Sequence, residues 1–159
     1  MEMLRQVLEE ITVDPAILGP LSSDVKPKAP GMKYRHYAPK ADLTLVETGQ
    51  GGPATMEKTQ VGRMIAKVRA LAEEKLSQGC RVGIICTDES RDSYPEGLVR
   101  SIGARDSQES VAHNLYGLLR EFDDLQVEYI FSESFPEDHL GQAIMNRLSK
   151  AAGYKIVRI

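Results

Sequence analysis

Hydrophobic and polar residues alternate in two repeating patterns along most of this chain. Short apolar or β-branched runs, of the kind that form buried strands, lie at 43–47, 82–86, 98–102, 127–131 and 155–159. Apolar residues recur at steps of three and four, as in amphipathic helices, over 61–76, 111–122 and 140–152. Because strands alternate with helices, the pattern predicts right-handed βαβ crossovers. We therefore expect an α/β fold: a Rossmann-like three-layer sandwich with a mostly parallel sheet of about five strands.

The first 40 residues have a different pattern. Apolar residues at helical spacing predict a short amphipathic helix over 2–11, with nothing nearby to pack against. The prolines that follow fix φ near −65° and prevent a regular helix; they are Pro15, Pro20, Pro27, Pro30 and Pro39. We therefore divide the chain into residues 1–11, an extended linker over 12–40, and an α/β domain over 41–159.

Composition places the chain among soluble globular proteins. Its 42% hydrophobic and 27% charged residues suffice to bury a core, and 159 residues allow one ordinary domain with a linker to spare. No apolar run approaches the roughly 18 to 20 residues that cross a bilayer, and the first residues lack the order of a signal peptide. We expect a cytoplasmic protein with no membrane partner.

Charge is unevenly distributed. The net charge of −3 argues against a chain whose main task is to coat nucleic acid. Residues 25–40 nevertheless hold five basic residues and no acidic one. The basic residues are Lys26, Lys28, Lys33, Arg35 and Lys40. Binding of anionic groups is therefore expected in the linker, if anywhere.

Parallel sheets bind ligands beyond the carboxyl ends of their strands, so the loops after the predicted strands are candidates. They contain acidic residues that more often are solvated caps than catalysts: Asp88, Glu89, Glu133, Glu137 and Asp138. The loop at 49–53 has neither dinucleotide-binding nor P-loop spacing, and we interpret it as a flexible turn. No nucleophile elbow of the G-x-S-x-G type occurs, which argues against a serine hydrolase of that class.

Metal binding is not indicated. The histidines lack a second ligand three or four residues away; they are His36, His113 and His139. We interpret His113 as a helix surface or packing residue. Asn146 and Arg147 lie within a predicted helix, where an arginine is more often a surface charge than a ligand contact.

The linker core at 30–39 is chemically unusual. In an extended chain, Lys33 and Arg35 share one side, Tyr34 and His36 share the other, and Tyr37 rejoins the first. Prolines at both ends reduce the entropic cost of ordering it. Such a segment can place cations and aromatic rings on a phosphate-bearing or planar ligand. The alternative is a solvated spacer that happens to be basic, although a spacer rarely gathers two tyrosines, a histidine and an arginine.

Three strings resemble those of a known family. The linker string at 29–39, APGMKYRHYAP, closely resembles the interdomain linker of two-domain L-threonylcarbamoyladenylate synthases, the Sua/YciO/YrdC group. The helical strings NLYGLLREFD at 114–123 and LGQAIMNRLSKAA at 140–152 resemble two motifs of that family's C-terminal domain. The resemblance spans residues 1–159. His139 stands where the family is expected to have glycine.

The resemblance implies a chemistry and a division of labour. The family makes threonylcarbamoyl-AMP and pyrophosphate from L-threonine, bicarbonate and ATP with magnesium, towards threonylcarbamoyladenosine in transfer RNA. Catalysis belongs to an N-terminal YrdC-like nucleotidyltransferase domain, of which only residues 1–11 resemble a part, the last helix. We therefore expect no catalytic residue, metal or cofactor in this chain, with ATP and magnesium bound by that partner domain in cis or in trans.

The family's linker crosses the mouth of the active cleft. By resemblance, residues 33–37 are expected to help close that cleft over nucleotide and threonylcarbamoyl groups and to exclude water. We expect no synthase activity from this chain alone, and only indirect contact with transfer RNA. Two alternatives stay open: a free-standing α/β domain that binds a nucleotide or another small ligand, and an RNA-binding adaptor that uses the basic linker.

Overall fold

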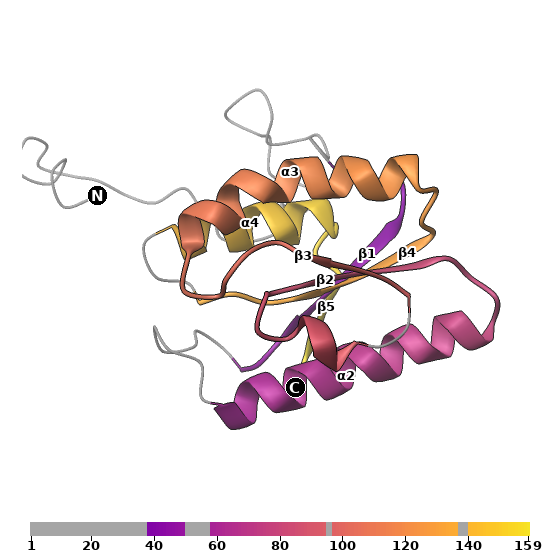
Figure 1. Ribbon diagram of the computed structural model, residues 1–159, viewed down its shortest axis with the longest axis horizontal. Coiled ribbons are helices and arrows are strands. Elements are labelled where there is room, and N and C mark those ends of the chain that lie inside the picture. Colours follow the sequence, from indigo (N-terminus) through magenta and orange to yellow (C-terminus); the bar gives the residue numbers. More distant parts are fainter. Residues whose placement is uncertain (1–37, 50–57, 95–96, 137–139) are drawn as a thin grey trace, which may run out of the picture. The chain divides into compact units, whose positions relative to one another are not determined.

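The computed structural model describes residues 38–49, 58–94, 97–136 and 140–159, and it shows one parallel sheet with helices on both faces (Figure 1). The strands are β1 (Asp42–Glu47), β2 (Val82–Cys86), β3 (Leu98–Ser101), β4 (Tyr129–Glu133) and β5 (Ile156–Arg158). Their order is β3-β2-β4-β1-β5, and every neighbouring pair is parallel. The predicted α/β class and five-stranded parallel sheet are confirmed.

Among the described residues, three α-helices cover the sheet. The long α2 (Lys58–Ser77) lies on one face, and α3 (Gln108–Asp124) and α4 (Gly141–Ala151) lie on the other (Figure 1). A short 3-10 helix, η2 (Arg91–Ser93), interrupts the connection from β2 to β3. A glycine follows the end of α2: Gly79 has φ of +80°, a conformation that glycine adopts without strain.

The core has one apolar cluster on each face. The larger packs the inner sides of α3 and α4 on the sheet and includes Phe122, Leu119 and Leu148. The smaller packs α2 on the opposite face through Met64 and Val68. Every residue of β2 is buried, as expected of a strand covered on both sides. No helix of the described residues combines the length and apolar character needed to cross a bilayer.

One predicted strand is shifted by two residues. The sequence pattern predicts a strand at 127–131, but β4 runs from Tyr129 to Glu133. The backbone N–H of Val127 donates to the carbonyl of Phe122 at 3.0 Å, so Val127 belongs to the turn that follows α3 and not to the strand. At the other end, Ser132 and Glu133 are polar yet completely buried, because β4 lies at the centre of the sheet. The other elements predicted within the described residues agree with the structure within a few residues.

The division at residue 40 stays a prediction. Residues 1–37, which include the predicted helix at 2–11 and most of the linker, lie outside the described residues. The described part of the linker is the short segment from Ala38 to Lys40, which leads into β1.

Candidate functional site

The carboxyl edge of the sheet is the first place to look for a site. After β1 the chain crosses to α2 on one face, whereas after β4 it crosses to α4 on the other (Figure 1). Because β1 and β4 are neighbours, their connections diverge at this edge, and such a point is where open α/β sheets bind ligands. Glu133, the last residue of β4, lies there, paired in register with Val46.

Glu133 is a buried carboxylate with a full set of partners. Its side chain has no exposed surface. One carboxylate oxygen accepts hydrogen bonds from the Ser90 hydroxyl at 2.6 Å and from the Tyr94 hydroxyl at 2.7 Å. The other pairs with the guanidinium of Arg105. A buried charge is tolerated only with such compensation, so these four residues act as one unit.

Arg105 extends this unit to the surrounding loops. Its guanidinium also donates to the carbonyl of Ser134 at 3.1 Å and lies 5.9 Å from the ring centroid of Phe135. Its backbone N–H donates to the carboxylate of Glu89 at 3.1 Å. The hydroxyl of Ser90, in turn, accepts from the backbone N–H of Thr87 at 3.1 Å. Side chains thus join the loops after β2, β3 and β4. We call Ser90, Tyr94, Arg105, Glu133 and Glu89 the carboxyl-edge network.

Burial and charge in this network change three pKa values. Burial, then the charge of Glu133 and the hydrogen bond to it, raises the pKa of the Tyr94 hydroxyl far above its ordinary value. Burial, reinforced by the Glu133 charge, raises the pKa of the Cys86 thiol to about 12. Desolvation opposes ionisation of Glu89, yet hydrogen bonds from the backbone N–H groups of Glu89 and Arg105 hold its pKa below the ordinary value. Tyr94 and Cys86 therefore stay protonated near neutral pH, which makes both poor nucleophiles.

The network fixes loops rather than presenting reactive groups. Both oxygens of Glu133 already face donors of the protein, and its side chain has no exposed surface. Within the described ranges, no three His, Cys, Asp or Glu side chains gather closely enough to hold a metal ion. These residues therefore do not fit the magnesium that the family's reaction implies. The chemistry they support is a structural ion pair.

The predicted binding residues of the linker are not placed by the structure. Lys33, Tyr34, Arg35, His36 and Tyr37 lie outside the described residues. Their role in covering an active cleft stays a prediction.

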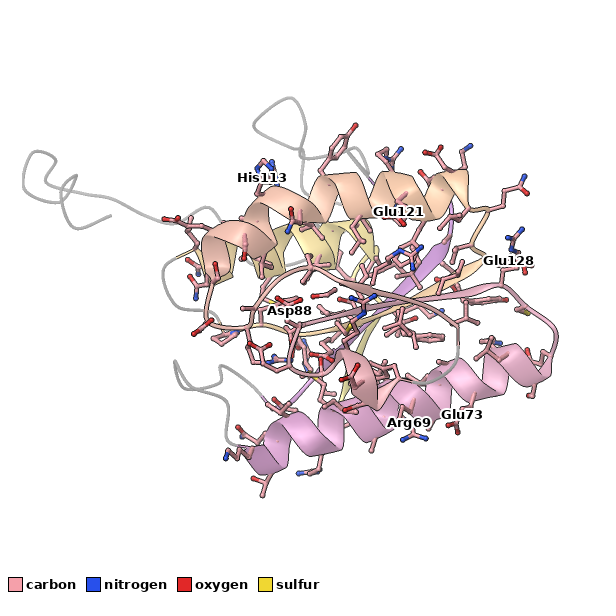
Figure 2. The ribbon with its side chains drawn as sticks, viewed as in Figure 1. Arg69, Glu73, Asp88, His113, Glu121 and Glu128 are labelled. Carbon is pink, nitrogen blue, oxygen red and sulfur yellow. The ribbon has the colours of Figure 1, made fainter. Side chains whose placement is uncertain are left out.

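Other sequence candidates have mixed outcomes. Glu137, Asp138, His139 and the loop at 50–53 also lie outside the described residues. Asp88 accepts a hydrogen bond from the Ser101 hydroxyl at 2.5 Å. The predicted surface positions are confirmed, since His113 on α3 (Figure 2) and Arg147 on α4 are exposed.

Sequence reasoning missed most of the carboxyl-edge network. It identified Glu133 only as one of several acidic residues after a strand, and it did not single out Ser90, Tyr94 or Arg105. The available signal was the place of Glu133 two residues after Phe131, where the apolar run ends. A charged residue that continues a central strand is buried and needs a cationic partner, which directs attention to the arginines of the neighbouring loops.

The described end of the linker lies at the opposite, amino edge. There the backbone N–H of Lys40 donates to a carboxylate oxygen of Asp123 at 2.7 Å. The guanidinium of Arg120 donates to the carbonyl of Ala38 at 3.0 Å. Both side chains belong to the last turns of α3, next to the start of β1. The segment from Ala38 to Lys40 is therefore bound to the end of α3.

Comparison with known proteins identifies the family. The family model described as threonylcarbamoyl-AMP synthase, C-terminal domain, matches residues 1–153. The threonylcarbamoyl-AMP synthase of Bacillus subtilis (strain 168) is 40% identical over 150 residues, which are 90% of this chain and 39% of that protein. The enzyme of the same name from Pyrococcus abyssi (strain GE5 / Orsay) is 38% identical over 159 residues, all of this chain and 41% of that protein.

Solved structures agree. The crystal structure of Pyrococcus abyssi Sua5 complexed with L-threonine superposes with a TM-score of 0.76 at 35% identity, over 99% of this chain and 41% of that one. The C-terminal Sua5 domain of a Pyrococcus horikoshii protein superposes with a TM-score of 0.56 at 33% identity, over 77% of this chain and all of that one. This chain spans about two fifths of the curated relatives named above. It belongs to the family of threonylcarbamoyl-AMP synthase C-terminal domains.

Proposed function

We propose that this chain is the accessory C-terminal domain and active-site-covering linker of a threonylcarbamoyl-AMP synthase. In this proposal a YrdC-like domain, supplied in cis or in trans, binds ATP with magnesium, L-threonine and bicarbonate in the cytoplasm. Residues 33–37 cover that domain's cleft. The α/β domain holds the linker in place and takes no part in the chemistry. The chain acts on transfer RNA only indirectly, through the product of the synthase reaction.

The observation that carries this proposal is family membership over residues 1–153, a range that contains the predicted linker and the α/β domain through the end of α4. The relatives named threonylcarbamoyl-AMP synthase are more than twice as long as the matched part, which leaves room in them for a separate catalytic domain. The carboxyl-edge network is consistent with the same view. Its buried carboxylate, that of Glu133, already binds side chains of the same domain with both oxygens.

The test compares the chain alone with a chimera. In the chimera, the part of the Bacillus subtilis relative that this chain does not match is fused before Met1. Threonine-dependent release of pyrophosphate from ATP is then measured for both proteins. We expect release from the chimera and none from residues 1–159 alone. Release by the chain alone would contradict the accessory role.

Two linker variants sharpen this test. Tyr34→Ala and Tyr37→Ala in the chimera are expected to lower the rate of pyrophosphate release by roughly tenfold, because loss of one well-placed contact costs on the order of 1–2 kcal/mol in the transition state. Unfolding of the α/β domain should be unchanged. Stabilisation of the isolated chain by a nucleotide would favour a free-standing binding domain. Salt-dependent binding of transfer RNA that is lost in Lys33→Ala would favour the adaptor.

A further inference from the structure

The segment that joins the linker to β1 is held by two side chains of one helix. Arg120 and Asp123 lie three residues apart on α3 and form an ion pair at 3.0 Å. Asp123 accepts from the Lys40 N–H, and Arg120 donates to the Ala38 carbonyl. The two side chains thus hold the polar backbone groups on either side of Pro39.

These contacts restrict the backbone between Ala38 and Lys40. Pro39 is buried and has no N–H of its own, and its ring restricts φ. With the Ala38 carbonyl and the Lys40 N–H both bound to α3, the backbone at this point has little freedom left. Tyr37, the last residue of the basic segment at 33–37, is bonded directly to Ala38.

The surroundings of the ion pair favour a preset geometry. Only 7% of the Asp123 side chain is exposed, so its carboxylate is held in place rather than swinging in solvent. The Arg120 guanidinium carbon lies 5.7 Å from the ring centroid of Tyr116, one helical turn earlier, a distance at which a cation and a ring attract each other. Tyr116, Arg120 and Asp123 therefore share one face of α3.

We propose that Arg120 and Asp123 form a clamp that positions the basic linker segment for its work on the catalytic domain. This inference rests on the proposed function, because the clamp matters to the reaction only if residues 33–37 cover the active cleft. Both are positioning residues and not catalytic ones, since they touch the linker backbone and not the reacting atoms. The clamp also explains a role for the string at 114–123, which contains Arg120 and Asp123: it binds the linker backbone. The family resemblance alone does not predict this role.

The first experiment measures the clamp itself in the full chain of 159 residues. Hydrogen exchange of the Lys40 amide is followed by NMR in the unchanged protein and in Asp123→Ala and Asp123→Asn. Removal of the acceptor in Asp123→Ala should speed exchange by roughly tenfold or more, whereas Asp123→Asn keeps an oxygen at the same place and should change it less. The control is Asp124→Ala, an exposed carboxylate one residue further along α3. Unchanged exchange in a folded Asp123→Ala protein would overturn the clamp.

The second experiment asks whether the clamp acts on the reaction. In the chimera, Arg120→Ala and Asp123→Ala should lower kcat for pyrophosphate release by about fivefold, while urea denaturation shows that both variants stay folded under the conditions of the assay. Arg147→Ala, an exposed arginine on α4, is the matched control and should leave kcat unchanged. Arg120→Lys keeps the charge but loses the planar fork that reaches both partners, so it should restore only part of the rate.

The outcomes separate this inference from the proposed function. If Tyr34→Ala and Tyr37→Ala leave kcat unchanged, the covering role of the linker fails, and the positioning role fails with it. If the tyrosine variants are slow but Arg120→Ala and Asp123→Ala are not, only the positioning role fails. A loss of kcat in both sets, with faster Lys40 exchange in Asp123→Ala, supports the clamp.

Discussion

The two edges of this sheet use the same kind of interaction to different ends. At the carboxyl edge, Arg105 and Glu133 form an ion pair whose carboxylate is completely buried. At the amino edge, Arg120 and Asp123 form a pair whose arginine is 40% exposed and whose carboxylate holds the linker backbone. The first pair closes the edge where open α/β sheets usually bind ligands. The second holds the backbone of Ala38 and Lys40, which follow the predicted linker residues 33–37 in sequence.

This contrast teaches where to look for function in an α/β domain. The strand order points to the carboxyl edge, but polar groups that are fully paired inside the protein are not available to a ligand. The amino edge has no comparable topological reason to hold a site. It matters here because the linker reaches β1 there, through Lys40 and Ala38. The following predictions test the contrast in order of expected effect.

Loss of the Glu133 carboxylate should have the largest effect. Glu133→Ala removes the carboxylate that pairs with the mostly buried Arg105 side chain and that accepts from the hydroxyls of Ser90 and Tyr94. We expect the free energy of unfolding, measured by urea denaturation, to fall by about 3–5 kcal/mol. Since domains of this size are stable by roughly 5–15 kcal/mol, the variant should be close to unfolding at room temperature.

Two further variants make that result specific. Glu133→Gln keeps the volume and part of the hydrogen bonding, so it should cost less, about 1–3 kcal/mol. Glu109→Gln changes an exposed carboxylate at the start of α3 and should stay within about 0.5 kcal/mol of the unchanged protein. A loss below 1 kcal/mol in Glu133→Ala would mean that the carboxyl-edge network is not a stabilising unit.

Alkaline pH should weaken the carboxyl edge next. The unfolded chain releases the Cys86 proton near pH 9.0 and the Tyr94 proton near pH 10.0, whereas the folded protein holds both longer because their pKa values are raised. Above pH 9 the unfolded state therefore binds fewer protons than the native state, and stability falls as pH rises. Each group should contribute a slope of about −1.4 kcal/mol per pH unit once its unfolded form ionises.

Removal of one group at a time identifies its contribution. Urea denaturation at intervals between pH 8 and 11 should show a smaller slope for Cys86→Ala from pH 9 onwards and for Tyr94→Phe from pH 10 onwards. Tyr94→Phe should also cost about 1–2 kcal/mol at pH 7, because Glu133 loses a donor. Equal slopes in all three proteins would show that neither group holds its proton on folding.

The amino edge should behave differently. Asp123→Ala removes the ion pair and the acceptor of the Lys40 N–H, but the pair is partly solvated and the segment it holds lies outside the core. We expect a loss of only about 1 kcal/mol in the free energy of unfolding by urea denaturation. A loss in the free energy of unfolding as large as that of Glu133→Ala would contradict the difference between the two edges, because the clamp would then stabilise the fold and not only position the linker.

The sequence predicts the fold well because the fold depends on burial, and burial leaves a periodic pattern. The run at 82–86 coincides with β2, and the helical spacing over 61–76 falls within α2. Prediction fails where burial and polarity disagree. Ser132 and Glu133 belong to β4, although nothing in their own chemistry suggests a buried strand.

Polar partners are harder to predict than elements. The string at 114–123 was recognised as a family motif, but the contact of Asp123 with Lys40 joins residues 83 apart in sequence. Likewise Arg105 lies 28 residues before Glu133. A repeating pattern records which side of an element faces the core, whereas pairing across loops is set by the folded topology. From the sequence, only the family resemblance associates the linker string with the α3 string. It does not predict which atoms of the two segments are in contact.

The smallest expected effect is on α2, where Arg69 and Glu73 form an ion pair one helical turn apart. A guanidinium nitrogen of Arg69 lies 3.5 Å from a carboxylate oxygen of Glu73, and both side chains are about half exposed, so water screens the attraction. Arg69→Ala should change the free energy of unfolding by no more than about 0.5 kcal/mol, and high salt should remove the difference. If this variant cost as much as Asp123→Ala, exposure would not explain why ion pairs differ across this domain, and the clamp would be indistinguishable from an ordinary surface pair.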